Sequence, residues 1–122
     1  MRDEFSQKTK QILSQRVGHR CSNPNCLAST SGPQVNSSKA INIGVAAHIT
    51  AASSGGPRFD SGQTTDQRQH PDNGIWLCQN CAWLIDSDEQ AYPVDLLREW
   101  KRQAEARAIG VKPYLHCATP LC

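Results

Sequence analysis

The sequence predicts a small α+β domain that a bound metal ion stabilises and that helices flank. The chain has 122 residues, a length that suits one domain. Hydrophobic residues make up 38 % of it, so we expect a modest core. Six cysteines are many for this length, and four of them form two closely spaced pairs. A small domain with a modest core often relies on a bound metal for stability.

The first predicted element is a helix over residues 3–17. Its apolar face is sparse and consists of Phe5, Ile12, Leu13 and Val17. Gly18 provides a good end for this helix. Residues 21–26 follow with the sequence CSNPNC, which predicts a tight turn because Asn and Pro favour turns.

Two short strands are predicted in the middle of the chain. Residues 29–38 are rich in Ser, Thr, Gly, Pro and Asn, which is typical of a loop. Residues 41–50 form the first strand candidate, with a bend at Gly44. Residues 74–77 form the second strand candidate.

A long polar stretch, residues 51–73, separates the two predicted strands. A short helix over residues 65–69 is expected to interrupt it. A loop of this length in a compact domain is usually functional or disordered. Residues 78–86 follow the second strand and are predicted as a turn that enters a helix.

The clearest helix is predicted over residues 93–109. Pro93 suits the first helical position and Gly110 suits the stop. One face of this helix is apolar and is formed by Leu96, Leu97, Trp100 and Ala104. Residues 111–122 show no periodicity, so the domain is predicted to span residues 1–110 and to be followed by a C-terminal tail.

Three tryptophans are assigned to the core of this domain. Trp76 lies in the second predicted strand, and Trp100 lies on the apolar face of the last helix. The chain around Trp83 is polar, but a buried indole is the more common arrangement, so we expect Trp83 to be buried as well.

The two close cysteine pairs predict a metal site. Cys21 and Cys26 have four residues between them, and Cys78 and Cys81 have two. Zinc takes four soft ligands in a tetrahedron at roughly 2.3 Å, and two short-spaced pairs supply them at little cost in chain entropy. The alternative is that these cysteines are buried thiols or form disulfides. The spacing favours a structural zinc ion.

The tail holds a third cysteine pair, Cys117 and Cys122, with the spacing of the first. These two cysteines could replace one pair of zinc ligands, or bind a second metal together with His116. A disordered tail with free thiols is favoured, because the segment is terminal and has no periodicity.

Charge and the N-terminal residues narrow the cellular context. The formal net charge of +2 neither indicates nor opposes nucleic-acid binding. Residues 1–10 are polar and charged and lack the apolar run of a signal peptide, and no later segment has the length and apolarity of a membrane span. The expected location is the cytoplasm, where cysteines bind metals more often than they form disulfides.

The segment between and around the cysteine pairs resembles a known family. Residues 45–53 read VAAHITAAS and include His48, and residues 72–81 read DNGIWLCQNC and include Asn73. A His on a strand, an Asn before a second strand and a Cys-x2-Cys that opens a helix resemble the HNH endonucleases of the ββα-metal class. The resemblance covers residues 18–90, and the helix after Pro93 is a frequent companion.

Two short segments narrow the resemblance further. Residues 47–53 and 84–86 look like the nuclease half of HNH effectors in bacterial anti-phage defence. Those effectors carry a C-terminal sensor of cyclic nucleotides, for which the residues available here leave no room. The resemblance therefore implies an isolated nuclease domain or a free-standing relative.

The resemblance implies a role for each matched residue. His48 would be the general base that deprotonates the attacking water, a task that suits a neutral imidazole. Asn73 would hold the catalytic loop and the base in position. The helix after Cys81 would offer a divalent metal, Mg²⁺ or Mn²⁺, to the scissile phosphate. The expected substrate is double-stranded DNA, cut with little sequence specificity because phosphate contacts carry little sequence information.

The sequence departs from the family pattern at two metal-ligand positions. Ala47 precedes the predicted base where Asp or His is frequent, and Ala82 follows Cys81 where the last His of the motif is expected. Asp86 lies one helical turn after position 82, and its carboxylate suits Mg²⁺, so it is the leading candidate ligand. Other candidates come from the long loop: His70, Asp60 and Asp72.

Basic residues are candidates for contacts with the DNA backbone. Arg58 follows Gly55, Gly56 and Pro57, and small residues let a backbone approach a phosphate that arginine can bind with two hydrogen bonds. Arg68 is a second candidate. Three basic residues of the last helix could also meet DNA, although a solvated helix face explains them equally well: Arg98, Lys101 and Arg102.

Two rival interpretations remain open at the level of sequence. Ala47 and Ala82 favour a non-catalytic zinc module that binds nucleic acid or protein. The other rival is an effector subunit that stays silent until it forms a homodimer or until a separate or missing sensor domain activates it.

Overall fold

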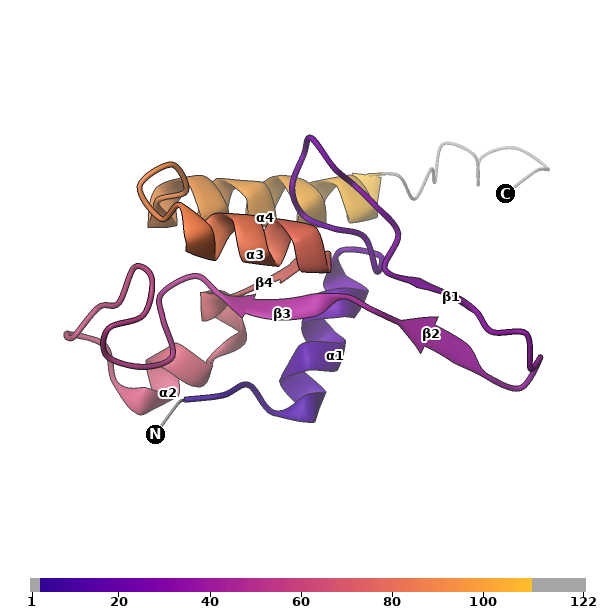
Figure 1. Cartoon of the computed structure of the whole chain (residues 1–122), viewed down its shortest axis with the longest axis horizontal. Coiled ribbons are helices and arrows are strands. Elements are labelled where there is room, and N and C mark those ends of the chain that lie inside the picture. Colours follow the sequence, from indigo (N-terminus) through magenta and orange to yellow (C-terminus); the bar gives the residue numbers. More distant parts are fainter. Residues whose placement is uncertain (1–2, 111–122) are drawn as a thin grey trace.

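The computed structural model describes residues 3–110 and shows a small α+β arrangement, which confirms the predicted class (Figure 1). The α-helices are α1 (Gln7–Arg16), α2 (Thr65–Gln69), α3 (Gln79–Ser87) and α4 (Val94–Gly110). The strands are β1 (Ser31–Pro33), β2 (Ala40–Asn42), β3 (Val45–His48) and β4 (Gly74–Leu77), and a 3-10 turn, η1, spans Pro71–Asn73. None of the described helices has the length and apolarity that crossing a membrane requires.

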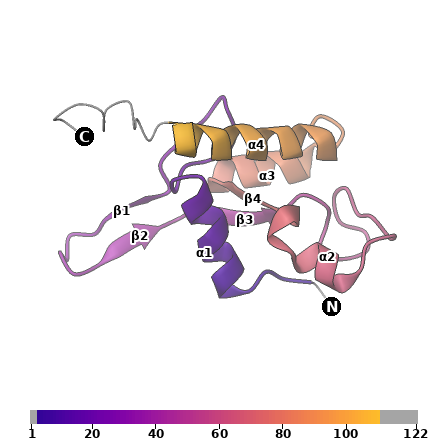
Figure 2. The ribbon, with the colours of Figure 1, turned by 180° about the vertical axis from the view of Figure 1, so that it is seen from behind.

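The antiparallel ribbon of β3 and β4 lies at the centre, with α1 on one face and α3 and α4 on the other (Figures 1 and 2). Alternating side chains serve the two faces, as the pleat of a strand requires. Ala47 and Ile75, which are paired in the register, join the core under α3 and α4. Ala46 and Trp76, the neighbouring pair, pack toward α1.

The flanking helices differ from the prediction at their starts. The chain before α1 is extended up to Ser6, whose Oγ accepts a hydrogen bond from Thr9 N (3.1 Å) and caps the helix. A helix start at residue 3 is therefore wrong, although Phe5 is buried as expected. In α4, Pro93 precedes the first helical residue, and its carbonyl accepts a hydrogen bond from Leu97 N (3.1 Å). Pro93 therefore lies just before the first helical residue, and not at the first helical position that the sequence predicts.

The single strand predicted over residues 41–50 is two strands. β2 pairs with β1 in a separate ribbon, whereas β3 pairs with β4. The predicted bend at Gly44 is the break between them, and a Cβ at this position would collide with the ring of Trp76. The loop predicted over residues 29–38 contains β1, because pairing with β2 imposes a strand on a segment of low strand propensity.

The other predicted elements agree with the structure. β4 and α2 have the predicted bounds, and α3 begins directly after Cys78. Trp76 and Trp100 are buried, but Trp83 is 78 % exposed on α3, so its assignment to the core is wrong. The tail of residues 111–122, with its cysteines Cys117 and Cys122, lies outside the described residues.

Candidate metal centre and the pocket beside it

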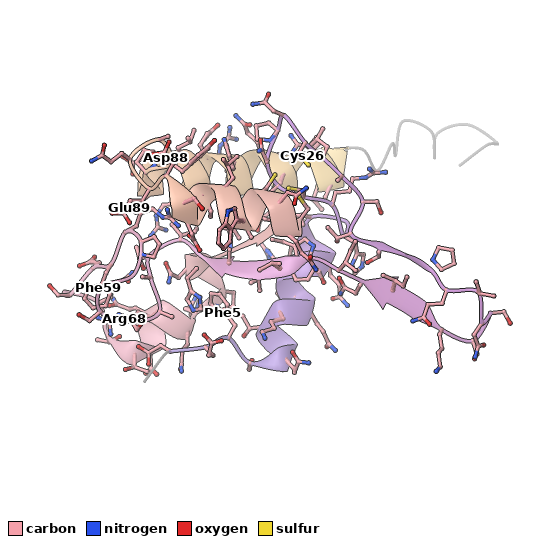
Figure 3. The ribbon with its side chains drawn as sticks, in the orientation of Figure 1. Phe5, Cys26, Phe59, Arg68, Asp88 and Glu89 are labelled. Carbon is pink, nitrogen blue, oxygen red and sulfur yellow. The ribbon has the colours of Figure 1, made fainter. Side chains whose placement is uncertain are left out.

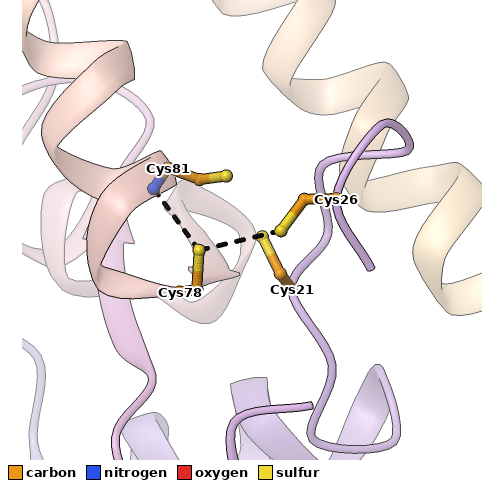
Figure 4. Close-up of side chains that lie close together, drawn as sticks. All are labelled: Cys21, Cys26, Cys78 and Cys81. Atoms are coloured by element: carbon orange, nitrogen blue, oxygen red, sulfur yellow. Dashed lines mark hydrogen bonds between the residues drawn. The ribbon is translucent and has the colours of Figure 1, made fainter. Parts of the chain in front are cut away.

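The four predicted cysteines come together in space. The sulfur atoms of Cys21, Cys26, Cys78 and Cys81 all lie within 4.8 Å of one another (Figure 4). The Cys26 and Cys78 sulfurs are 3.8 Å apart. Four sulfurs at zinc's usual bond length in a tetrahedron would be separated by roughly 3.8 Å. None of the four forms a disulfide, so the disulfide alternative is wrong for them, and the cluster can hold a metal ion such as zinc.

Local backbone contacts shape the two halves of this cluster. The carbonyl of Asn23 accepts from Cys26 N (2.9 Å), which closes the turn that brings Cys26 toward Cys21. Ser22 N donates to Trp76 O (2.9 Å) and ties this turn to β4. Cys78 caps α3, with its sulfur accepting from Cys81 N (3.4 Å). The first cysteine pair is therefore held against β4, the strand that leads into the second cysteine pair.

The electrostatics of the cluster suit a cation. Burial raises the pKa of the Cys21 thiol to about 11 and also raises the pKa of Cys81. Burial opposes ionisation of Cys78 too, but hydrogen bonds led by that from the Cys81 amide outweigh it, so the pKa of Cys78 is lowered. A bound metal cation would compensate the cost of buried thiolates, because zinc binds thiolate rather than thiol.

Asn23 is a contributor that the sequence did not single out. Its Nδ2 donates to the Cys81 sulfur (3.4 Å), and its side chain is buried. Hydrogen bonds of this kind orient ligands in metal sites. From the sequence, Asn23 is explained as a turn residue, because Asn favours turns. Nothing in the sequence indicates its contact with a cysteine sulfur.

His48 is the last residue of β3, and other groups hold its ring in place. The imidazole stacks on Phe5, with ring centroids 3.9 Å apart and planes 9° apart. Figure 3 shows Phe5 beneath the ribbon of β3. The Nε2 of His48 lies 2.8 Å from the carbonyl oxygen of Asp3. Because a carbonyl has no proton to give, Nε2 carries the proton, and Nδ1 is the basic nitrogen of the neutral ring.

Asn73 is buried and fixes the segment that follows His48. Its Oδ1 accepts from Thr50 N (3.0 Å) and Thr50 Oγ1 (2.9 Å). Its Nδ2 donates to Thr50 O (3.0 Å) and Arg68 O (3.1 Å), and its backbone carbonyl accepts from Ile49 N (2.8 Å). These contacts make Asn73 a junction between η1, α2 and the end of β3.

A small pocket of about 170 Å³ lies between β3 and α3. His48 and Asp86 both line it, and Ala82 contributes to its wall. The Asp86 side chain is 51 % exposed, and its Oδ1 accepts from Arg58 Nη2 (2.8 Å). The predicted base and the leading candidate metal ligand therefore line the same pocket, while the His48 ring stacks on Phe5 on the α1 side of β3.

The other candidate metal ligands lie elsewhere. His70 and Asp72 line a separate pocket beside α2, and Asp60 lines neither pocket. Ala47 and Ala82 have apolar side chains. Neither of the two positions where the resemblance predicts a metal ligand therefore supplies a ligand atom. Among residues 3–110, the cysteine cluster is the only group of three or more His, Cys, Asp or Glu side chains arranged to hold a metal ion.

Arg58 and Arg68 are tied into the protein. The Arg58 side chain is 5 % exposed, and it donates from Nε to Ile49 O (2.7 Å) and from Nη1 to Ile85 O (2.8 Å). Arg68 pairs with Asp3 (3.4 Å) and lies over the ring of Phe59, as Figure 3 shows. Both arginines anchor the long loop, and this placement offers no support for their predicted contacts with DNA.

No model of a known protein family matches the chain, and no curated protein matches it either. Function is therefore inferred from the residues and their geometry.

Removal of the metal should unfold the domain. We expect about one zinc ion per chain in purified protein, and we expect a strong chelator to abolish its cooperative melting transition, because the cluster joins two distant segments. Metal content by mass spectrometry and melting by circular dichroism measure both effects. Cys78→Ser should reproduce the loss, whereas Cys117→Ser should retain metal and melting. Equal zinc content in parent and Cys78→Ser would contradict the assignment.

Proposed function

We propose that this chain is an HNH-type nuclease domain of the ββα-metal class. It would hydrolyse phosphodiester bonds of double-stranded DNA in the presence of Mg²⁺ or Mn²⁺, with little sequence specificity. The cysteine cluster would hold a structural zinc ion. One observation carries the proposal: His48, oriented through Nε2, and Asp86 line the same pocket. The proposed setting is the cytoplasm, and the proposed role is that of an anti-phage effector.

His48 supplies the general base of the proposed reaction. Its Nδ1 accepts a proton from the water that attacks the phosphorus atom. The Asp3 carbonyl, 2.8 Å from Nε2, favours the ring that carries both protons after the transfer. Asn73 is a positioning residue, because its hydrogen bonds to Thr50 fix the backbone directly after His48.

Asp86 is the ligand proposed for the catalytic divalent ion. Mg²⁺ is commonly held by one or two carboxylates together with substrate phosphates and water, so a single exposed carboxylate fits its requirements. A bound ion stabilises negative charge on the phosphate and on the leaving oxygen. Arg58 holds Asp86 at the pocket through Oδ1.

A second function has an observation in its favour. Ala47 and Ala82 leave the pocket poor in metal ligands, and Arg58 already occupies one carboxylate oxygen of Asp86. These features favour a zinc-containing module that binds nucleic acid and does not cut it.

A third proposal keeps the nuclease but makes cutting depend on a homodimer or on a separate sensor domain. In that case nicking rises with protein concentration or on fusion to a dimeriser.

Substitution of His48 tests the proposed base. His48→Ala should lower the rate of supercoiled plasmid nicking about a hundredfold or more, the usual contribution of a general base. The matched control is His70→Ala, which removes an exposed histidine outside the pocket. Because His48 also anchors residues 3–5, zinc content and melting of each variant should be recorded. Nicking by a folded His48→Ala protein at the parent rate would refute the base assignment.

Substitution of Asp86 tests the proposed ion site. Asp86→Asn keeps an oxygen for Arg58 but loses the charge, so we expect nicking to fall about tenfold or more and to need more Mg²⁺. Asp88→Asn, an exposed change at the end of α3, should leave nicking unchanged. The measurement is the nicking rate against Mg²⁺ concentration. Identical curves for the parent and Asp86→Asn would remove Asp86 from the site.

A further inference from the structure

A second, larger cavity of about 540 Å³ adjoins the catalytic pocket. It shares Val45, Ala46 and His48 with that pocket, but α1 bounds it where α3 bounds the other. Its volume falls within the range of sites for small organic ligands. We propose that this cavity binds a nucleobase.

The polar groups of the cavity are mainly carboxamides. Gln7 and Gln11 lie one turn apart on α1 and therefore project from the same side of the helix. Their side chains make no hydrogen bond with any residue in the described part of the chain. Asn42, at the end of β2, is fixed because its Oδ1 accepts from Gly44 N (3.2 Å), which directs its Nδ2 to other acceptors. These groups offer both donors and acceptors, as the edge of a base requires.

The floor of the cavity is apolar and aromatic. Phe5 and Trp76 both line it and are each 5 % exposed. The backbone of Gly44 lies directly against the Trp76 ring, where a Cβ would collide with it. A ring with apolar faces and polar edges matches a cavity that combines apolar residues with carboxamides.

The charges of the cavity favour a neutral group over a second phosphate. Lys10 and Glu4 both line it, and their opposite charges balance. A subsite for phosphate commonly has an excess of cations. The uncharged carboxamides are therefore the groups that select the ligand.

The position of the cavity links it to the proposed reaction, on which this step rests. A strand with its scissile phosphate at His48 would place a neighbouring base at the cavity that His48 also lines. In a duplex that base must leave the stack, as in enzymes that extrude a nucleotide. Gln and Asn pair with adenine through two hydrogen bonds, so adenine is the expected preference.

Binding of short single strands tests the proposal without cleavage. Fluorescein-labelled homopolymers of the four deoxynucleotides are titrated with protein and no added divalent ion, and anisotropy reports the affinity. We expect the parent to bind deoxyadenosine strands most tightly, and the double variant Gln7→Ala/Gln11→Ala to lose about tenfold of that preference. Gln15→Ala, on α1 but beside a different pocket, should match the parent. If the double variant keeps the parent's affinities for all four strands and for deoxyadenosine monophosphate, the proposal is wrong.

Two further measurements extend this test. One asks whether the base belongs to a strand or to a free nucleotide, and the other distinguishes failure of this proposal from failure of the proposed nuclease function. Loss of deoxyadenosine monophosphate binding in the double variant, with its strand affinities unchanged, would assign the cavity to a free nucleotide. Plasmid nicking is measured on the same proteins. Base-dependent binding without nicking would uphold the cavity and refute the nuclease. Nicking by a double variant that binds every strand and nucleotide as the parent does would refute the cavity alone.

Discussion

The cluster of four cysteine sulfurs is the constraint on which the arrangement of the other elements depends. It joins the turn after α1 to the junction of β4 and α3, where Cys78 both caps the helix and contributes a sulfur. The position at which α3 begins determines where this helix runs along β3. That course in turn puts Ala82 and Asp86 in the wall of the pocket that His48 also lines. A metal ion in the cluster would thus stabilise the fold and set the width of the candidate catalytic pocket.

Polar contacts, rather than a large core, hold the remaining side of the site. In the long loop between β3 and β4, Arg58 donates to the carbonyl of Ile85 on α3, and Arg68 donates to the carbonyl of Asp60 within the loop. Asn73 connects the same loop to Thr50 by hydrogen bonds in both directions. Buried networks of this kind are costly to leave partly satisfied, so they favour a single arrangement. This rigidity is what the proposed base, His48, would need in order to keep its orientation.

Local patterns in the sequence were sufficient for part of this description. The helix α4 and the cysteine pairs follow from periodicity and spacing, which are properties of short segments. β1 could not be predicted, because Ser31 to Pro33 become a strand only through pairing with β2. The burial of Arg58 also escaped prediction, since its partners are carbonyls of Ile49 and Ile85, and every residue has a carbonyl. Contacts between distant backbone groups leave no mark on composition.

X-ray absorption at the zinc edge of the purified chain tests the metal cluster most directly. The account predicts a first shell of about four sulfur atoms at roughly 2.3 Å, with no nitrogen or oxygen neighbour at bonding distance. Such a shell in both the parent and Cys117→Ser/Cys122→Ser would place the ion among the four cysteines. A shell that contains nitrogen or oxygen, or a preparation without zinc whose four cysteines remain reduced thiols, would contradict the account.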